Sequence, residues 1–126
     1  MANQLPQRTL GRTGLRVSAL GFGGAVIGDL YSIIDESTAL ETIRTSLDGG
    51  VNLLDTSPLY GHGLSELRIG AALRQVPDRG FIISTKIGRA VGAKDYPAIG
   101  KYFKMAIRTC VCVCVCVCVC VCVLSL

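Results

Sequence analysis

Short apolar segments alternate with amphipathic helical segments along the central part of the chain, and this order constrains the fold more than any other feature. The apolar segments 19–24, 51–56 and 81–86 have the length of short buried strands. Between them, 35–50 and 64–75 show the apolar spacing of helices. Strands joined by helices pair in parallel through right-handed crossovers, so the sequence predicts an α/β fold built on a parallel sheet.

Both predicted helices carry residues suited to their ends. Asp35 and Ser37 offer side-chain oxygens to the start of the first helix, and Gly49–Gly50 is expected to end it. Ser65 is a plausible cap for the second helix, and Pro77 is expected to stop it.

The glycines near the N-terminus predict turns rather than a nucleotide-binding loop. Segment 8–20, "RTLGRTGLRVSAL", predicts a β-hairpin because glycines stand at both ends of its turn. The later stretch "GFGGAV" has Val26 where a dinucleotide-binding GxGxxG fingerprint needs its third glycine. These glycines therefore do not indicate a Rossmann fold.

Chemically useful residues stand where the predicted strands end. Gly23–Gly24, Asp55 and Lys86 occupy the three strand ends, and Tyr60 follows Asp55 by five residues. The carboxyl ends of parallel strands meet on one rim of the sheet, where α/β folds bind their ligands. An ammonium beside a phenol favours the phenolate, and a carboxylate holds that ammonium in place. The trio of Asp55, Tyr60 and Lys86 thus predicts proton transfer to a carbonyl oxygen, with hydride supplied by a cofactor.

Each member of the trio also has a purely structural interpretation. A strand-end aspartate commonly caps a turn, a loop tyrosine commonly packs half-buried, and a strand-end lysine commonly faces solvent. Spacing alone leaves both interpretations open.

Three motifs in order within residues 8–89 resemble the aldo-keto reductase superfamily: "LGRTGLRVSALGFGG", "GVNLLDTSPLYGHGLSELRIGAAL" and "ISTKIGR". The wording "DTSPLYG" is most similar to the branch that contains L-galactose dehydrogenase, aldose 1-dehydrogenases and pyridoxal 4-dehydrogenase. The resemblance implies a (β/α)8 TIM barrel with an N-terminal hairpin plugging its bottom, of which this sequence supplies about three of eight strands. It also implies an NAD(P)-dependent oxidoreductase acting on a small aldehyde, ketone or sugar.

Site residues follow from this resemblance. It assigns Asp55, Tyr60 and Lys86 as catalytic, with Tyr60 as the proton donor. It places Gly23, Gly24 and Asp55 near the nicotinamide of NADP or NAD. No metal ligands are assigned.

One catalytic residue of the family has no counterpart in this sequence. The family carries a histidine at the end of the next strand, whereas the only histidine here is His62, two residues after Tyr60. His62 either lines the entrance to the substrate site or faces solvent as a loop residue.

The last part of the sequence departs from the family pattern. All seven cysteines alternate with valine from Cys110 to Val123. A repeated TG dinucleotide encodes such an alternation in every frame, so we expect 1–109 to be the N-terminal part of a reductase barrel and 110–126 a non-native or disordered low-complexity tail. For the tail, the alternatives are thiolate metal binding and a short membrane anchor. For the whole chain, the alternative is a non-catalytic fragment.

Barrels of this kind need about 250 residues, so we expect a truncated chain with weak cofactor binding and little or no activity.

Charge and N-terminal composition limit the partners. The net charge is +4, and no run of five like charges indicates a nucleic-acid arm. Arg8, Arg12 and Arg16 interrupt any signal-peptide pattern. The sequence predicts a cytoplasmic protein with a small carbonyl or sugar substrate and no specific protein partner.

Overall fold

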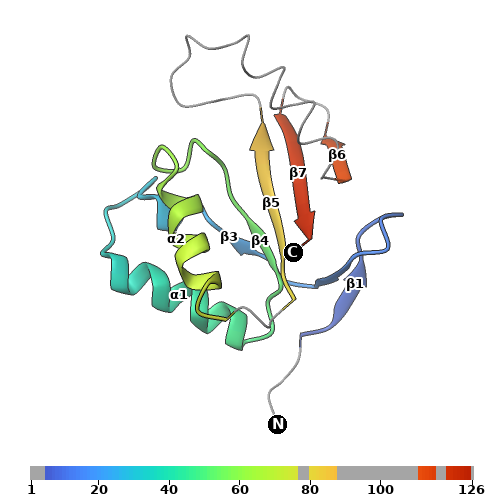
Figure 1. The fold of residues 1–126 in the computed structure, drawn as a ribbon, viewed down its shortest axis with the longest axis horizontal. Helices are drawn as coiled ribbons and strands as arrows, with labels where there is room; N and C mark the ends of the chain where they lie inside the picture. Colours follow the sequence, from blue (N-terminus) through green and yellow to red (C-terminus); the bar gives the residue numbers. More distant parts are fainter. Residues whose placement is uncertain (1–4, 77–79, 88–110, 116–118, 126) are drawn as a thin grey trace.

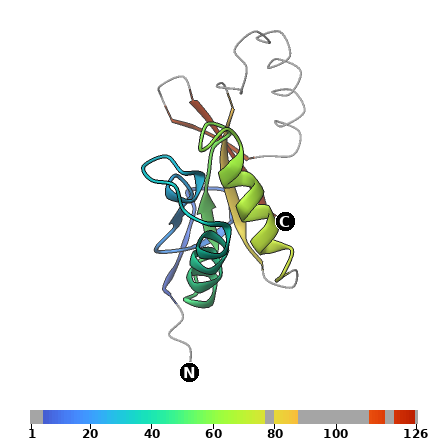
Figure 2. The ribbon, with the colours of Figure 1, turned by 90° about the vertical axis from the view of Figure 1, so that its left-hand side faces the viewer.

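A computed structural model describes residues 5–76, 80–87, 111–115 and 119–125, and for 87 and the last two ranges it describes the backbone alone. In this part of the chain, two helices cover one face of the first three strands of a five-stranded sheet, and a two-stranded hairpin lies at one end of it (Figures 1 and 2). The predicted helix stop at Pro77 lies outside the described residues.

The first three strands of the sheet are parallel, as the strand–helix order predicts. They are β3 (Phe22–Gly23), β4 (Leu53–Asp55) and β5 (Ile82–Ile87), with β4 in the middle. The register pairs Gly23 with Asp55 and Asp55 with Ser84. The carboxyl ends of the three strands therefore share one rim, and the described sheet does not close into a barrel.

Two strands from the Cys-Val region extend the sheet. Strand β7 (Val119–Ser125) runs antiparallel to β5, and β6 (Val111–Val115) runs antiparallel to β7, which gives the order β3-β4-β5-β7-β6. Strict two-residue alternation suits an extended backbone. The structure describes no side chains in this region, so the expected alternatives of metal binding and of a non-native tail stay predictions.

The first helix, α1 (Glu36–Asp48), begins where its capping residue predicts. The Asp35 carboxylate accepts a hydrogen bond of 2.8 Å from the Thr38 backbone N–H. Ser37 donates its hydroxyl to the same carboxylate, so Asp35 and not Ser37 is the cap. The predicted end is also confirmed, since the helix stops at Gly49 and Gly50 adopts a φ of +92°.

Replacing Asp35 with Ala is expected to lower the melting temperature by about 5 °C, because an N-cap is lost. Hydrogen bonds from Ser37 and Thr38 hold the Asp35 pKa well below its ordinary value of 3.8. Its stabilising effect is therefore complete above that value and disappears as the pH falls through the lower folded-state pKa. Thermal melts at neutral and acidic pH measure this difference, and Asp35→Asn, which keeps a capping oxygen, is the control. Equal melting temperatures of Asp35→Ala and the parent at neutral pH would contradict the role.

The second helix, α2 (Leu64–Leu73), corrects the predicted cap at Ser65. The N-cap position is Gly63, whose φ of +95° admits few residues other than glycine, and no side chain caps this end. Ser65 lies inside the first turn and is fully buried. Its hydroxyl donates to the Gly24 carbonyl at 2.8 Å and lies 2.8 Å from the Thr56 hydroxyl. The prediction failed because a left-handed loop starts the helix before Ser65 and turns that residue toward the sheet.

The hairpin of β1 (Gln7–Thr9) and β2 (Arg16–Ser18) lies at the amino end of the sheet, as the resemblance implies. Asn52, just before β4, accepts a hydrogen bond of 2.7 Å from the Ser18 N–H and donates one of 2.9 Å to the Arg16 carbonyl. Val17 packs against Ile82 beside these bonds. The hairpin thus covers the end of the sheet opposite the rim that carries Asp55 and Lys86.

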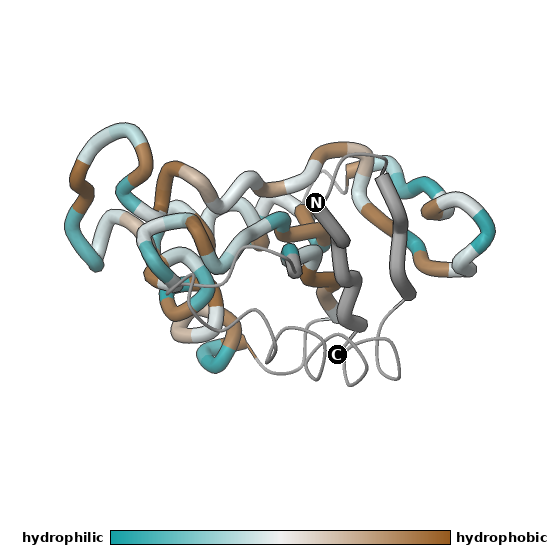
Figure 3. The backbone as a smooth tube through the Cα atoms, turned by 90° about the horizontal axis from the view of Figure 1, so that it is seen from above, coloured by the Kyte–Doolittle hydropathy of each residue, from teal (hydrophilic) through white to brown (hydrophobic). Residues whose placement is uncertain are grey.

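The main core lies between the helices and the sheet. Apolar residues are interspersed with polar ones at short intervals along the chain (Figure 3). The buried members of this core are Ile27, Ala39, Ile43, Leu47, Leu54, Ile69, Ala72 and Leu73. In the described part of the chain, no helix has the length and hydropathy needed to cross a bilayer.

Candidate active site

The candidate site lies on the sheet face that the helices do not cover. Leu54 and Ile83 pack into the core beneath the helices. Because successive strand residues point to opposite faces, Asp55 on β4 and Ser84 and Lys86 on β5 share the other face. Asp55 is the direct cross-strand partner of Ser84. Strand periodicity and register therefore bring these three polar side chains together.

The Asp55 carboxylate has a separate partner for each oxygen. Lys86 Nζ lies 2.8 Å from Oδ2, and the Ser84 hydroxyl donates to Oδ1 at 2.9 Å. The Lys86 ammonium also donates to the Thr56 carbonyl at 2.9 Å. Burial favours the neutral amine, but the hydrogen bond and charge of Asp55 and the nearby Tyr60 outweigh burial and raise the Lys86 pKa above its ordinary value. Lys86 is therefore a cation at neutral pH.

Tyr60 meets this cation from the loop that follows β4. Lys86 Nζ lies 5.0 Å from the centre of the Tyr60 ring, within the range of a cation–π contact. The tyrosine is half-buried. The structure thus brings together the predicted Asp55, Tyr60 and Lys86, while their catalytic role stays a prediction.

Two glycines set the position of the Tyr60 loop. A Cβ on Gly28, at the end of the short helix η1 (Val26–Gly28), would lie 2.6 Å from the Tyr60 carbonyl carbon. A Cβ on Gly61 would collide with the Gly28 carbonyl oxygen, and Gly61 has a φ of +63°. The two loops therefore touch backbone to backbone, which only glycine permits.

A Gly28→Ala variant is expected to lose about 2 kcal/mol of folding free energy, because the added methyl group forces the two loops apart. It should also weaken the Tyr60–Lys86 contact. Urea unfolding followed by circular dichroism measures the loss. Gly70→Ala on α2 is the matched control, because its Cβ meets only the flexible end of Arg74 at 3.6 Å and alanine favours helix. If Gly28→Ala is as stable as Gly70→Ala, the close approach of the two loops does not limit the residue at position 28.

The two glycines predicted to lie near the cofactor differ in their surroundings. Gly24 is buried, and a Cβ there would lie 2.5 Å from the Ser65 hydroxyl oxygen and 2.9 Å from the Asp55 carbonyl. Gly23 is exposed in register with Asp55, and a Cβ there would meet nothing within 4 Å. Gly24 is thus required by packing, whereas Gly23 leaves open space beside Asp55.

His62 is exposed and has a φ of +52° between Gly61 and Gly63. Within the described residues, no hydrogen bond or ion pair joins His62 to Asp55, Tyr60 or Lys86. The solvent-facing interpretation therefore agrees with its exposure.

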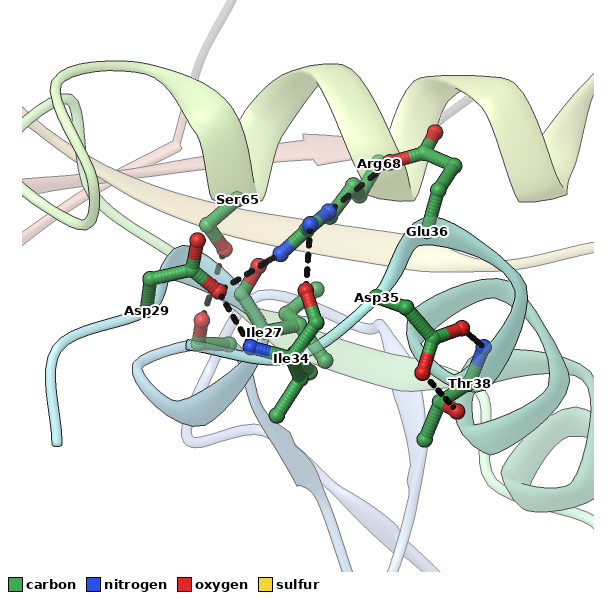
Figure 4. Close-up of polar contacts among 9 residues, drawn as sticks. Ile27, Asp29, Ile34, Asp35, Glu36, Thr38, Ser65 and Arg68 are labelled. Atoms are coloured by element: carbon green, nitrogen blue, oxygen red, sulfur yellow. Dashed lines mark hydrogen bonds and ion pairs between the residues drawn. The ribbon is translucent and has the colours of Figure 1, made fainter. Parts of the chain in front are cut away.

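A buried arginine, which the sequence pattern does not single out, organises the loop before α1. Arg68 on α2 donates to the carbonyls of Ile27 at 2.7 Å and Ile34 at 2.9 Å, and to the carboxylates of Asp29 and Glu36 at 2.9 Å each (Figure 4). Only 6% of Arg68 is exposed. Burial opposes its charge, yet Glu36 and Asp29 outweigh this and raise the Arg68 pKa. An isolated arginine in a helical pattern offers no signal for such a role.

Comparison with known proteins identifies the family. The model of the aldo/keto reductase family matches residues 19–112, which is more than half of the chain. The chain belongs to the aldo/keto reductase family. Its sequence is 43% identical over 93 residues to L-galactose dehydrogenase of Arabidopsis thaliana, covering 72% of this chain and 29% of that enzyme. It is also 43% identical over 83 residues to pyridoxal 4-dehydrogenase of Microbacterium luteolum, covering 66% of this chain and 24% of that enzyme.

Solved aldo-keto reductases share the fold. An aldo-keto reductase of Pseudomonas aeruginosa matches with a TM-score of 0.59 and 36% identity, covering 71% of this chain and 35% of that one. The holo form of a Bacillus halodurans aldo-keto reductase matches with a TM-score of 0.50 and 39% identity, covering 56% of this chain and 22% of that one. The predicted partial TIM barrel is thereby confirmed. The chain spans less than a third of the length of the curated relatives named above.

Proposed function

We propose that this chain provides the proton-transfer part of an NAD(P)-dependent oxidoreductase site for a small aldehyde, ketone or sugar. The observation that carries the proposal is the contact between Lys86 and both Asp55 Oδ2, at 2.8 Å, and the Tyr60 ring, at 5.0 Å. The family is one of oxidoreductases, and the named relatives are dehydrogenases.

The proposed step moves one proton at Tyr60. The phenol O–H bond breaks as a new O–H bond forms on the carbonyl oxygen of the substrate, and the resulting phenolate is stabilised by the Lys86 ammonium. Asp55 holds that ammonium, and in the oxidation direction the phenolate takes the proton back from the alcohol. The nicotinamide supplies or accepts the hydride when it is bound.

The described residues fit the nicotinamide end of such a cofactor. Gly23 leaves open space beside Asp55 on the rim, which suits a nicotinamide ring. The phosphate sites of this barrel type come from its last two strands, whereas the described parallel strands are β3, β4 and β5. We therefore propose that the 126-residue chain alone binds NADP or NAD weakly and turns over little or no substrate.

A hybrid enzyme tests the proposal. Residues 1–87 of this chain replace the corresponding residues of Arabidopsis L-galactose dehydrogenase, and oxidation of L-galactose is followed through cofactor absorbance. We expect turnover by the hybrid and none by the chain of residues 1–126. A folded hybrid without turnover would refute the proposed site and favour a non-catalytic fragment. Turnover by the chain alone would refute its inactivity.

A further inference from the structure

We propose that Ser84 is a positioning residue, which fixes the Asp55 carboxylate so that Lys86 stands beside Tyr60. Its catalytic meaning rests on the proposed function, whereas its effect on Lys86 is measurable without any reaction. Neither the sequence motifs nor the family match assigns a role to this serine.

The geometry around Ser84 fits this role. Only 7% of Ser84 is exposed, and its hydroxyl donates to Asp55 Oδ1 at 2.9 Å from the directly paired position on the next strand. Lys86 binds the other oxygen, Oδ2, at 2.8 Å. The carboxylate is thus fixed at two points, one from a short buried side chain and one from a long flexible one.

Without Ser84, Lys86 is the one side-chain hydrogen-bond partner left to the Asp55 carboxylate among the described residues. Its side chain is 44% exposed, so water competes for the freed oxygen. The carboxylate torsion of an aspartate is broad, and a single bond to a flexible lysine restricts it little. We expect the Asp55–Lys86 contact to loosen and the ammonium to spend less time beside the Tyr60 ring.

The next residue on β5 provides a matched control. Thr85 also donates its hydroxyl to a carboxylate, Glu66 Oε1 at 2.7 Å, but on the face toward α2. Thr85→Val therefore removes one strand hydroxyl bound to a carboxylate without touching the candidate site. Ser84→Thr keeps a hydroxyl at the tested position, and Ser84→Cys replaces it with a poor donor of similar size.

The experiment is an NMR titration of the full chain labelled at the lysine ε-carbons, with Lys86 assigned through Lys86→Arg. Ser84→Ala and Ser84→Cys should lower the Lys86 titration midpoint by about one pH unit, a tenfold loss of proton affinity. Ser84→Thr and Thr85→Val should leave it unchanged. Midpoints that do not move in Ser84→Ala or Ser84→Cys, or that move equally in Thr85→Val, would overturn the proposal.

A second readout separates this proposal from the proposed function. In the hybrid enzyme, Ser84→Ala should lower kcat about tenfold with little change in KM, because it alters how the proton donor is held and not how substrate binds. If the hybrid shows no turnover while the Lys86 midpoint still falls in Ser84→Ala, the proposed function fails and the positioning role stands. If turnover is present but neither the midpoint nor kcat responds to Ser84→Ala, the positioning role fails alone.

Discussion

Replacing Tyr60 with Phe is expected to lower the turnover of the hybrid enzyme by about 1,000-fold, the size typical of losing a general acid. The change removes one oxygen and its proton from the ring. The ring itself stays over Lys86, at the 5.0 Å found for tyrosine, so the cation–π contact and the loop position are retained. The measurement is steady-state oxidation of L-galactose, together with a cofactor titration that should show unchanged affinity.

Tyr31→Phe is the matched control for this prediction. Tyr31 is 77% exposed in the loop before α1, and it undergoes the same chemical change outside the Asp55–Lys86 cluster. The melting temperatures of Tyr60→Phe and Tyr31→Phe should both lie close to that of the parent. Turnover of Tyr60→Phe within a factor of a few of Tyr31→Phe would show that the phenol is not the proton donor.

Replacing Arg68 with Met is expected to remove about 3 kcal/mol of folding free energy, because a buried charged donor leaves its acceptors unpaired. Two backbone carbonyls, those of Ile27 and Ile34, lose their guanidinium donors, and the Asp29 carboxylate loses the bond that lowers its pKa most. Domains of this size are stable by about 5–15 kcal/mol, so the loss is a large share of the total. Urea unfolding followed by far-ultraviolet circular dichroism measures it.

Two variants control for helix composition and for charge. Arg44→Met makes the same change at an exposed position of α1 and should cost under about 0.5 kcal/mol. Arg68→Lys keeps the charge but lacks the planar fork that reaches the four acceptors, so it should recover only part of the loss. If Arg68→Met and Arg44→Met are equally stable, the guanidinium does not hold the loop.

Several parts of the fold were predictable because their signals are local. The apolar spacing of 35–50 predicts α1, and the oxygen of Asp35 before it marks the start. The same reasoning placed Asp55 and Lys86 at strand ends, where parallel pairing brings them to one rim. Tyr60 joins them through a loop whose course the spacing could not define, and its role as proton donor stays a prediction.

Other parts depend on contacts between residues far apart in the sequence. Ser65 has the chemistry of a cap, yet its hydroxyl bonds the Gly24 carbonyl 41 residues away. Ser84 was predictable in principle, since it precedes Lys86 by two residues and shares its face, but its partner Asp55 lies on another strand.

The amino-acid order by itself determined the succession of strands and helices and the rim on which the reactive groups gather, because periodicity and capping act over a few residues. Only the tertiary structure decided that Arg68 binds the loop before α1, that Gly28 touches the Tyr60 segment and that Ser84 holds Asp55. Burial and hydrogen bonding between distant segments depend on how the elements pack, and neither leaves a local pattern in the chain.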